Sequence, residues 1–180
     1  MSGAEHHFSK ALAIRERLSA NDGANAAWQR DLSVSHGKLG TLCVAKGDFS
    51  AAERHFRESL AIRERLVASD PGNAAWQYDL GLSFEWLGRV AQARGHLYEA
   101  KNYYMRKFQI AERLAATNPD NLAWLYDLSV SNERLGSVAQ AQGKTDEAIG
   151  FYGNRDSITK RLAASGWGSE AWERDLFYSC

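Results

Sequence analysis

The sequence is poor in the residues that crosslink a chain, break its helices or place it in a membrane. Only two cysteines and two prolines occur in 180 residues. Cys43 and Cys180 cannot form a disulfide framework, which fits a reducing compartment. No stretch approaches the roughly 20 apolar residues that a membrane span needs, and the first residues lack the apolar core of a signal peptide. These absences predict a cytoplasmic protein with no membrane partner.

An excess of one charge is missing as well. The chain has 22 Lys+Arg and 22 Asp+Glu, so its formal net charge is zero. Proteins that bind nucleic acid usually carry a basic face and a high isoelectric point, because they must neutralise phosphates. We therefore expect no nucleic-acid partner.

Catalytic signatures are also absent. The sequence contains no Gly-x-x-x-x-Gly-Lys loop, His-Glu-x-x-His, Cys-x-x-Cys or Gly-x-Ser-x-Gly motif. The five histidines lack metal-ligand spacing apart from the adjacent His6 and His7, and Gly166-Trp-Gly168 is typical of a turn. The sequence predicts no enzyme, no cofactor and no metal site.

What the sequence does contain is a repeat of 48 residues. A Trp-x-x-Asp-Leu block occurs four times at this spacing, and a Leu-Gly pair and a later glycine follow the first three at a constant offset. Such agreement in a fixed register indicates a repeat architecture. The tryptophans are Trp28, Trp76, Trp124 and Trp172, and the glycines that follow are Gly47, Gly95 and Gly143.

Each unit has the pattern of two helices. After Trp76 the larger apolar residues fall three or four apart, which lines one helical face, and Gly95 then interrupts the pattern. A second stripe of the same spacing covers residues 97–114. Asn73 and Asn121 stand where they would cap the helix that follows each joint. No alternating pattern typical of strands competes, so the sequence predicts an all-α fold.

This register resembles the tetratricopeptide repeat signature. Leu39-Gly40, Gly47 and Ala52-x-x-x-Phe56 match it, and the pattern returns twice at the 48-residue offset. Glycine in the first helix permits close approach of the second, and alanine followed by an aromatic packs as a small–large pair. The common repeat has about 34 residues, so this variant is lengthened. The usual aromatic three residues before Leu-Gly is replaced by His36 and Asn132 in two of the three units.

The resemblance implies a right-handed α-solenoid of antiparallel helix pairs, a superhelix formed by the chain as a single domain. On this basis residues 1–23 are a partial repeat with a second helix only. Full repeats cover 24–71, 72–119 and 120–167, and 168–180 begin another first helix.

The resemblance also implies a function in protein–protein interaction, as a scaffold. In this family the first helices line a concave groove that takes a peptide or a partner helix. These positions vary between units whereas the packing positions repeat, as expected of residues that read a ligand. They are Lys38, Thr41 and Ala45 in the first full unit, Glu85, Trp86, Arg89 and Gln92 in the second, and Glu133, Arg134, Ser137 and Gln140 in the third.

Trp86, an aromatic among charged residues, has the make-up of a binding hot spot; solvated side chains without a partner are the competing interpretation. Family members that grip a C-terminal carboxylate use Lys, Asn and Arg, and only Arg134 fits that set among the matching positions. An acidic or amphipathic segment that meets Arg89 and Arg134 is the better expectation. The positions that do not fit are Gly37, Thr41, Trp86 and Val130.

Other repeated features favour structural roles. Tryptophans present in every unit are expected to hold neighbouring helices together, and Cys43 aligns with alanines, which predicts a small buried residue. The Arg-Glu-Arg triplets at 15–17 and 63–65 have the pattern of a solvated helix face.

The two ends and the third unit depart from the pattern. Neither end has the polar capping helix of a solenoid, so we expect head-to-tail self-association, a structural assembling role, or a place within a larger multidomain signalling protein. Gly150, Gly153 and Asp156 weaken the second helix of the third unit, and Trp167 stands where the joint proline should be. Residues 150–160 are therefore expected to be irregular or the first to open.

Overall fold

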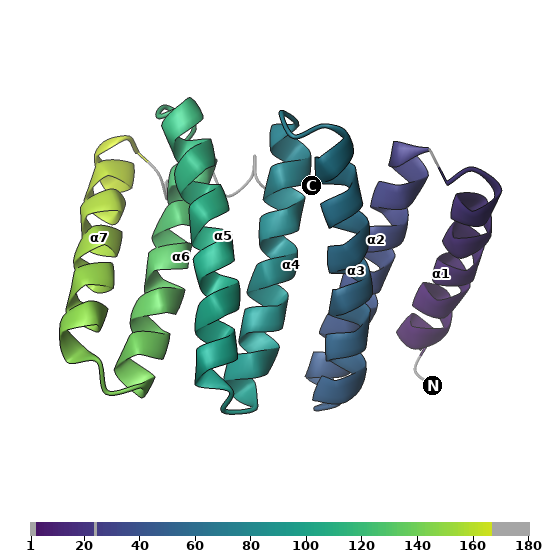
Figure 1. The fold of residues 1–180 in the computed structure, drawn as a ribbon, viewed down its shortest axis with the longest axis horizontal. Helices are drawn as coiled ribbons and strands as arrows, with labels where there is room; N and C mark the ends of the chain where they lie inside the picture. The colour runs from purple at the N-terminus through teal and green to yellow at the C-terminus, as the bar shows by residue number, and fades with distance from the viewer. Residues whose placement is uncertain (1–2, 24, 167–180) are drawn as a thin grey trace. The chain divides into compact units, whose positions relative to one another are not determined.

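The computed structural model describes residues 3–23 and 25–166, with side chains from Lys10 onward. These residues form helices and no strand, which confirms the all-α prediction (Figure 1). Predictions for Trp167, Trp172, Cys180 and the partial repeat at 168–180 lie outside the described residues, as do the side chains of His6 and His7. The helices are α1 (Gly3–Asn21), α2 (Ala26–Ala45), α3 (Phe49–Ser69), α4 (Ala74–Ala93), α5 (Leu97–Thr117), α6 (Leu122–Ala141) and α7 (Thr145–Ala164).

The chain divides into two compact units, the first ending at Lys107 and the second beginning at Phe108. Helices α2, α4 and α6 begin 48 residues apart, and so do α3, α5 and α7.

The joints are closed by the same local interactions each time. An asparagine before each first helix accepts a hydrogen bond from the backbone N–H of the tryptophan three residues later, at 3.1–3.2 Å. This confirms the predicted caps at Asn73 and Asn121 and adds Asn25. The glycine after each first helix has φ between 73° and 78°, in the left-handed region where glycine has no Cβ to clash. These glycines are Gly47, Gly95 and Gly143.

Within each pair, the Leu-Gly glycine of the first helix faces the aromatic ring of the second. A Cβ on Gly88 would lie 2.5 Å from the ring of Tyr104, and one on Gly40 would lie 2.4 Å from the ring of Phe56. In the second unit, a Cβ on Gly136 would lie 2.7 Å from Tyr152. The rings therefore rest directly on the glycine backbone. The close helix approach predicted from the signature is confirmed.

The repeated tryptophans pack against small apolar clusters. Trp76 contacts a cluster of Leu32, Ile62 and Leu66 in the first unit. Trp124 contacts a cluster of Ala115, Leu125 and Leu162 in the second unit. The structural role predicted for these two tryptophans is confirmed. Cys43 is half-buried rather than fully buried and packs beside Phe56.

A histidine pair replaces an aromatic pair between α2 and α3. His36 Nδ1 lies 3.2 Å from His55 Nδ1, with the ring centroids 5.5 Å apart. The equivalent side chains one repeat later, Phe84 and Tyr103, stack at 6.5 Å. Burial lowers the pKa of both histidines, and His36 lowers that of His55 further. At this distance the Nδ1 atom of one ring donates its N–H to the Nδ1 atom of the other. The nearby charged groups that act on the pair are Arg54, which lowers the pKa of His55, and Glu16 and Glu58, which raise both pKa values.

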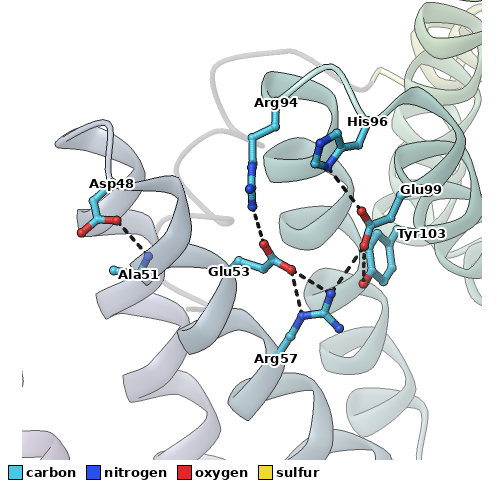
Figure 2. Close-up of polar contacts among 8 residues, drawn as sticks. All are labelled: Asp48, Ala51, Glu53, Arg57, Arg94, His96, Glu99 and Tyr103. Carbon is cyan, nitrogen blue, oxygen red and sulfur yellow. Dashed lines mark hydrogen bonds and ion pairs between the residues drawn. The ribbon is translucent and has the colours of Figure 1, made fainter.

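Charged side chains connect α3 with the turn and helix that follow α4 (Figure 2). Glu53 accepts from Arg57 and from Arg94, each at 2.7 Å, and Arg57 also reaches Glu99 at 3.4 Å. Exposed ion pairs of this kind stabilise weakly one by one and more as a network. The residue equivalent to Glu53 in the next repeat is Lys101, so the same network cannot form around that position.

Helix α7 corrects one expectation. It runs without interruption from Thr145 to Ala164, so the predicted irregularity is wrong. Gly150 and Gly153 are exposed, and no atom lies within 4 Å of where their Cβ atoms would be. Each glycine lowers the stability of the helix by about 1 kcal/mol relative to alanine. The helix nevertheless continues through both positions. Early opening of residues 150–160 stays a prediction.

Substitutions at two helical glycines should have opposite effects. Gly88→Ala forces a methyl group into the ring of Tyr104 and should lower the free energy of unfolding by about 1–3 kcal/mol. Gly150→Ala places its methyl in open space and should raise that free energy by about 1 kcal/mol. Urea unfolding followed by circular dichroism measures both. Equal effects at the two sites would contradict the packing described.

The histidine pair should make stability depend on pH. Because both pKa values lie below the usual 6.5 in the folded chain, the unfolded chain binds more protons at acid pH. The free energy of unfolding therefore keeps its full value above about pH 6.5, the pKa of histidine in the unfolded chain. It declines as the pH falls below that value. The double variant His36→Phe/His55→Tyr, which copies the second repeat, should lose less stability between pH 7.5 and 5.5. An identical loss in wild type and variant would exclude this role.

Amide hydrogen exchange tests the opening of α7. Residues 150–160 should exchange faster than the equivalent residues 54–64 of α3, because α7 carries two glycines and α3 carries none in these segments. Uniform protection of the two segments would show that the glycines have no such effect.

Candidate partner-binding groove

A hollow of about 570 Å³ lies in the first unit, lined by α2 and α4, with one residue of α3 in its wall. We call it the α2–α4 groove. Its lining mixes apolar side chains with three charged ones, so it can contact both parts of an amphipathic ligand. The lining residues are Val34, Gly37, Lys38, Thr41, Leu42, Ala45, Arg63, Asp79, Leu82 and Trp86.

A second hollow of about 320 Å³ adjoins the groove, and Thr41 and Trp86 line both. We call it the apolar pocket, because six of its lining residues are hydrophobic and only Thr41 and Arg89 are polar. The hydrophobic ones are Val44, Phe49, Phe56, Trp86, Val90 and Ala93.

Trp86 forms the wall between the two hollows. Its ring stacks on Phe56 at a centroid distance of 5.2 Å, and the Cζ atom of Arg63 lies 5.0 Å from its ring centre. A Cβ on Gly37 would lie 2.5 Å from the Trp86 ring, so only glycine leaves room for it. The indole is thus half-buried and held in place rather than standing free in solvent.

Some of the predicted groove residues line the two hollows, whereas others make contacts within the protein. Lys38 and Thr41 line the groove, and Arg89 lines the apolar pocket. Glu85 instead pairs with the buried Lys107, and Gln92 accepts a hydrogen bond from the Tyr104 hydroxyl at 3.0 Å. The predicted residues of the second repeat therefore have mixed roles.

The predicted residues of the third repeat fall in the second unit. Glu133, Ser137 and Gln140 line a polar hollow of about 400 Å³ together with Tyr152 and Arg155, and Arg134 is not among its lining residues. Gln140 accepts a hydrogen bond from the Tyr152 hydroxyl at 3.1 Å, and the Arg155 guanidinium lies over the Tyr152 ring.

Arg63 contradicts the interpretation of its triplet as a solvated face. Only 2% of the residue is exposed. Its Nη1 donates to the Asp79 carbonyl at 2.6 Å and to Ser83 Oγ at 3.0 Å, and its Nε donates to Ser33 Oγ at 3.2 Å. Burial lowers its pKa to about 10. Small residues occupy the equivalents of positions 33 and 83 in every repeat, so no departure in the sequence marks the buried Arg63.

No cluster of three or more His, Cys, Asp or Glu side chains in the described part of the chain has the arrangement to hold a metal ion. Among those same residues, no helix combines the length and the apolar character that crossing a membrane requires.

Comparison with known proteins places a family match on the first full repeat. Residues 37–71, from the middle of α2 into the joint after α3, match the family model described as "Tetratricopeptide repeat". No curated protein matches the chain.

Several solved structures are similar to the chain. A DHF79 filament is 14% identical over 95% of this chain and 93% of its own, with a TM-score of 0.37. The de novo designed helical repeat protein DHR64 is 13% identical, covering 95% and 87%, with a TM-score of 0.38. BtubC (BKLC) from P. vanneervenii is 14% identical, covering 92% of each chain, with a TM-score of 0.30.

The family match covers the Leu-Gly pair of α2, the left-handed Gly47 and the whole of α3. The same elements carry the contact of the Phe56 ring with Gly40 and the buried Arg63. Residues 37–71 therefore match a tetratricopeptide repeat both in sequence and in the glycine–aromatic contact of the helix pair.

Proposed function

We propose that the chain binds a segment of a partner protein in the α2–α4 groove, with a bulky apolar side chain of that segment in the apolar pocket. The observation that carries this proposal is the pocket itself: a hydrophobic hollow beside a fixed tryptophan, with Arg89 as its one charged lining residue. Burying a large apolar side chain contributes about 1.5–3 kcal/mol. A pocket of this kind is where interface energy concentrates.

The charges around the groove support an acidic segment. Lys38 and Arg89 are exposed beside the two hollows. The acidic residues nearby are engaged within the protein, because Asp79 accepts from Arg30 at 2.7 Å and Glu85 pairs with Lys107. Lys38 and Arg89 thus offer positive charge to the ligand, whereas the carboxylate of Asp79, which also lines the groove, is already paired with Arg30. Catalysis is not part of this proposal.

Selection from a library of random displayed peptides tests the proposal. Peptides with acidic residues around one bulky apolar residue should be enriched, and Arg89→Glu should weaken their binding about tenfold or more, as expected for a hot-spot residue. Fluorescence anisotropy with labelled peptides measures the affinity. Arg65→Glu, an exposed residue of α3 that lines neither hollow, is the matched control.

Two outcomes would overturn the proposal: enrichment of no peptide, or peptides whose affinity is the same for wild type and Arg89→Glu. Trp86→Ala should abolish binding as well. Because that variant removes a packed ring, its fold has to be checked by circular dichroism before its affinity is interpreted.

Self-association through the chain ends stays a separate prediction, since residues 168–180 lie outside the described part. Light scattering at high micromolar concentration tests it, and a monomeric mass would exclude it.

A further inference from the structure

We infer that Arg63 is the receptor for a carboxylate group of the bound segment, at the side of the α2–α4 groove. This inference rests on the proposed function and specifies its chemistry. It depends on the hydrogen bonds of Arg63, on the absence of an ion pair with any carboxylate of the described residues, and on its place in the groove wall.

The hydrogen bonds of Arg63 all go to neutral acceptors. Nη1 and Nε donate to one backbone carbonyl and to the hydroxyls of Ser33 and Ser83. Within the described residues, Nη2 makes no hydrogen bond and no carboxylate lies within ion-pair distance of the guanidinium. A buried cation without a paired anion is costly, because solvent no longer stabilises its charge.

Other cations of the first unit differ from Arg63 in this respect. The buried Lys107 pairs with Glu85, and Arg30 pairs with the carboxylate of Asp79. Arg63 hydrogen-bonds Asp79 only through the backbone carbonyl, and the Asp79 carboxylate, which Arg30 holds at 2.7 Å, acts on the charge of Arg63 without an ion-pair contact. Taken together, Arg30, Arg63 and Asp79 leave one positive charge without its own counter-ion.

The position of Arg63 makes that charge available to a ligand. It lines the groove together with Lys38, while the Trp86 ring covers one side of the guanidinium. The residue equivalent to Gly37 is a glutamate in both later repeats, Glu85 and Glu133. In the first repeat this position is a glycine covered by the Trp86 ring, so the repeat supplies no carboxylate of its own there. A planar guanidinium suits a carboxylate best, through two parallel hydrogen bonds.

The first arm of the test uses the wild-type chain and a simple probe. Sodium acetate is titrated while the ¹⁵N side-chain resonance of Arg63 is followed by NMR, and sodium chloride at equal ionic strength is the control. Arg15, the equivalent residue one repeat earlier, is the internal reference, because it donates to Ser35 and does not line the groove. The Arg63 resonance should shift to saturation with acetate only. Equal responses to acetate and chloride would overturn the inference.

The second arm uses the selected peptides. Each Asp or Glu is replaced in turn by Asn or Gln, and each peptide is made with a free and with an amidated C-terminus to separate side-chain from terminal carboxylates. Loss of one carboxylate should weaken binding to wild type about tenfold or more. The same loss should change binding to Arg63→Met by about twofold or less, with Arg15→Met behaving as wild type. Arg63→Lys keeps the charge but loses the planar guanidinium, and it replaces Arg63→Met in this test if Arg63→Met does not fold.

The two arms separate this inference from the proposed function. Peptides that bind but tolerate replacement of every carboxylate would overturn the role of Arg63 and leave the groove as a binding site. An acetate response at Arg63 with no selected peptide would support the anion site and contradict the proposed peptide binding.

Discussion

The contact of an aromatic ring with the backbone of a glycine sets the spacing of each helix pair. Gly40, Gly88 and Gly136 receive Phe56, Tyr104 and Tyr152 at distances that no Cβ would allow. Interiors are close-packed, so a change of one methyl group at such a contact displaces whole helices. Every other contact between α2 and α3, including the histidine pair and the buried Arg63, presupposes this approach. The same contact holds Phe56 where it can support Trp86.

The groove arises where one repeat departs from the pattern of the others. Gly37 stands in place of glutamate and admits the ring of Trp86, whose equivalents in the other repeats are Lys38 and Arg134. A glycine thus has two different uses on α2: Gly40 brings α3 close, and Gly37 makes room for a side chain of α4. The first use recurs in every repeat and serves stability. The second occurs once and leaves hollows on both sides of an aromatic wall, which is why specificity in a repeat protein resides in the positions that do not repeat.

The regular part of this structure could be predicted from the sequence because its determinants are local and recur. Helix periodicity, the caps at Asn73 and Asn121, and the glycine–aromatic contacts all lie within one repeat and appear several times. Arg63 and the pair of His36 and His55 could not be predicted in this way. Their partners lie on other helices, 16 to 30 residues away, and nothing in the spacing marks them. Regularity of α7 was missed for another reason: exposed glycines cost stability without breaking hydrogen bonds.

A net charge of zero conceals how the charges are distributed. In the first unit, Asp79 is engaged by Arg30, Glu85 by Lys107, and Glu53 by Arg57 and Arg94. Each of these pairs neutralises a carboxylate, including that of Asp79, which itself lines the groove. The cations at the two hollows are Lys38, Arg63 and Arg89. Opposite charges that are already paired contribute little field at a distance. The local arrangement of charge around the two hollows, rather than the net charge of the chain, is therefore what supports the proposal of an acidic segment.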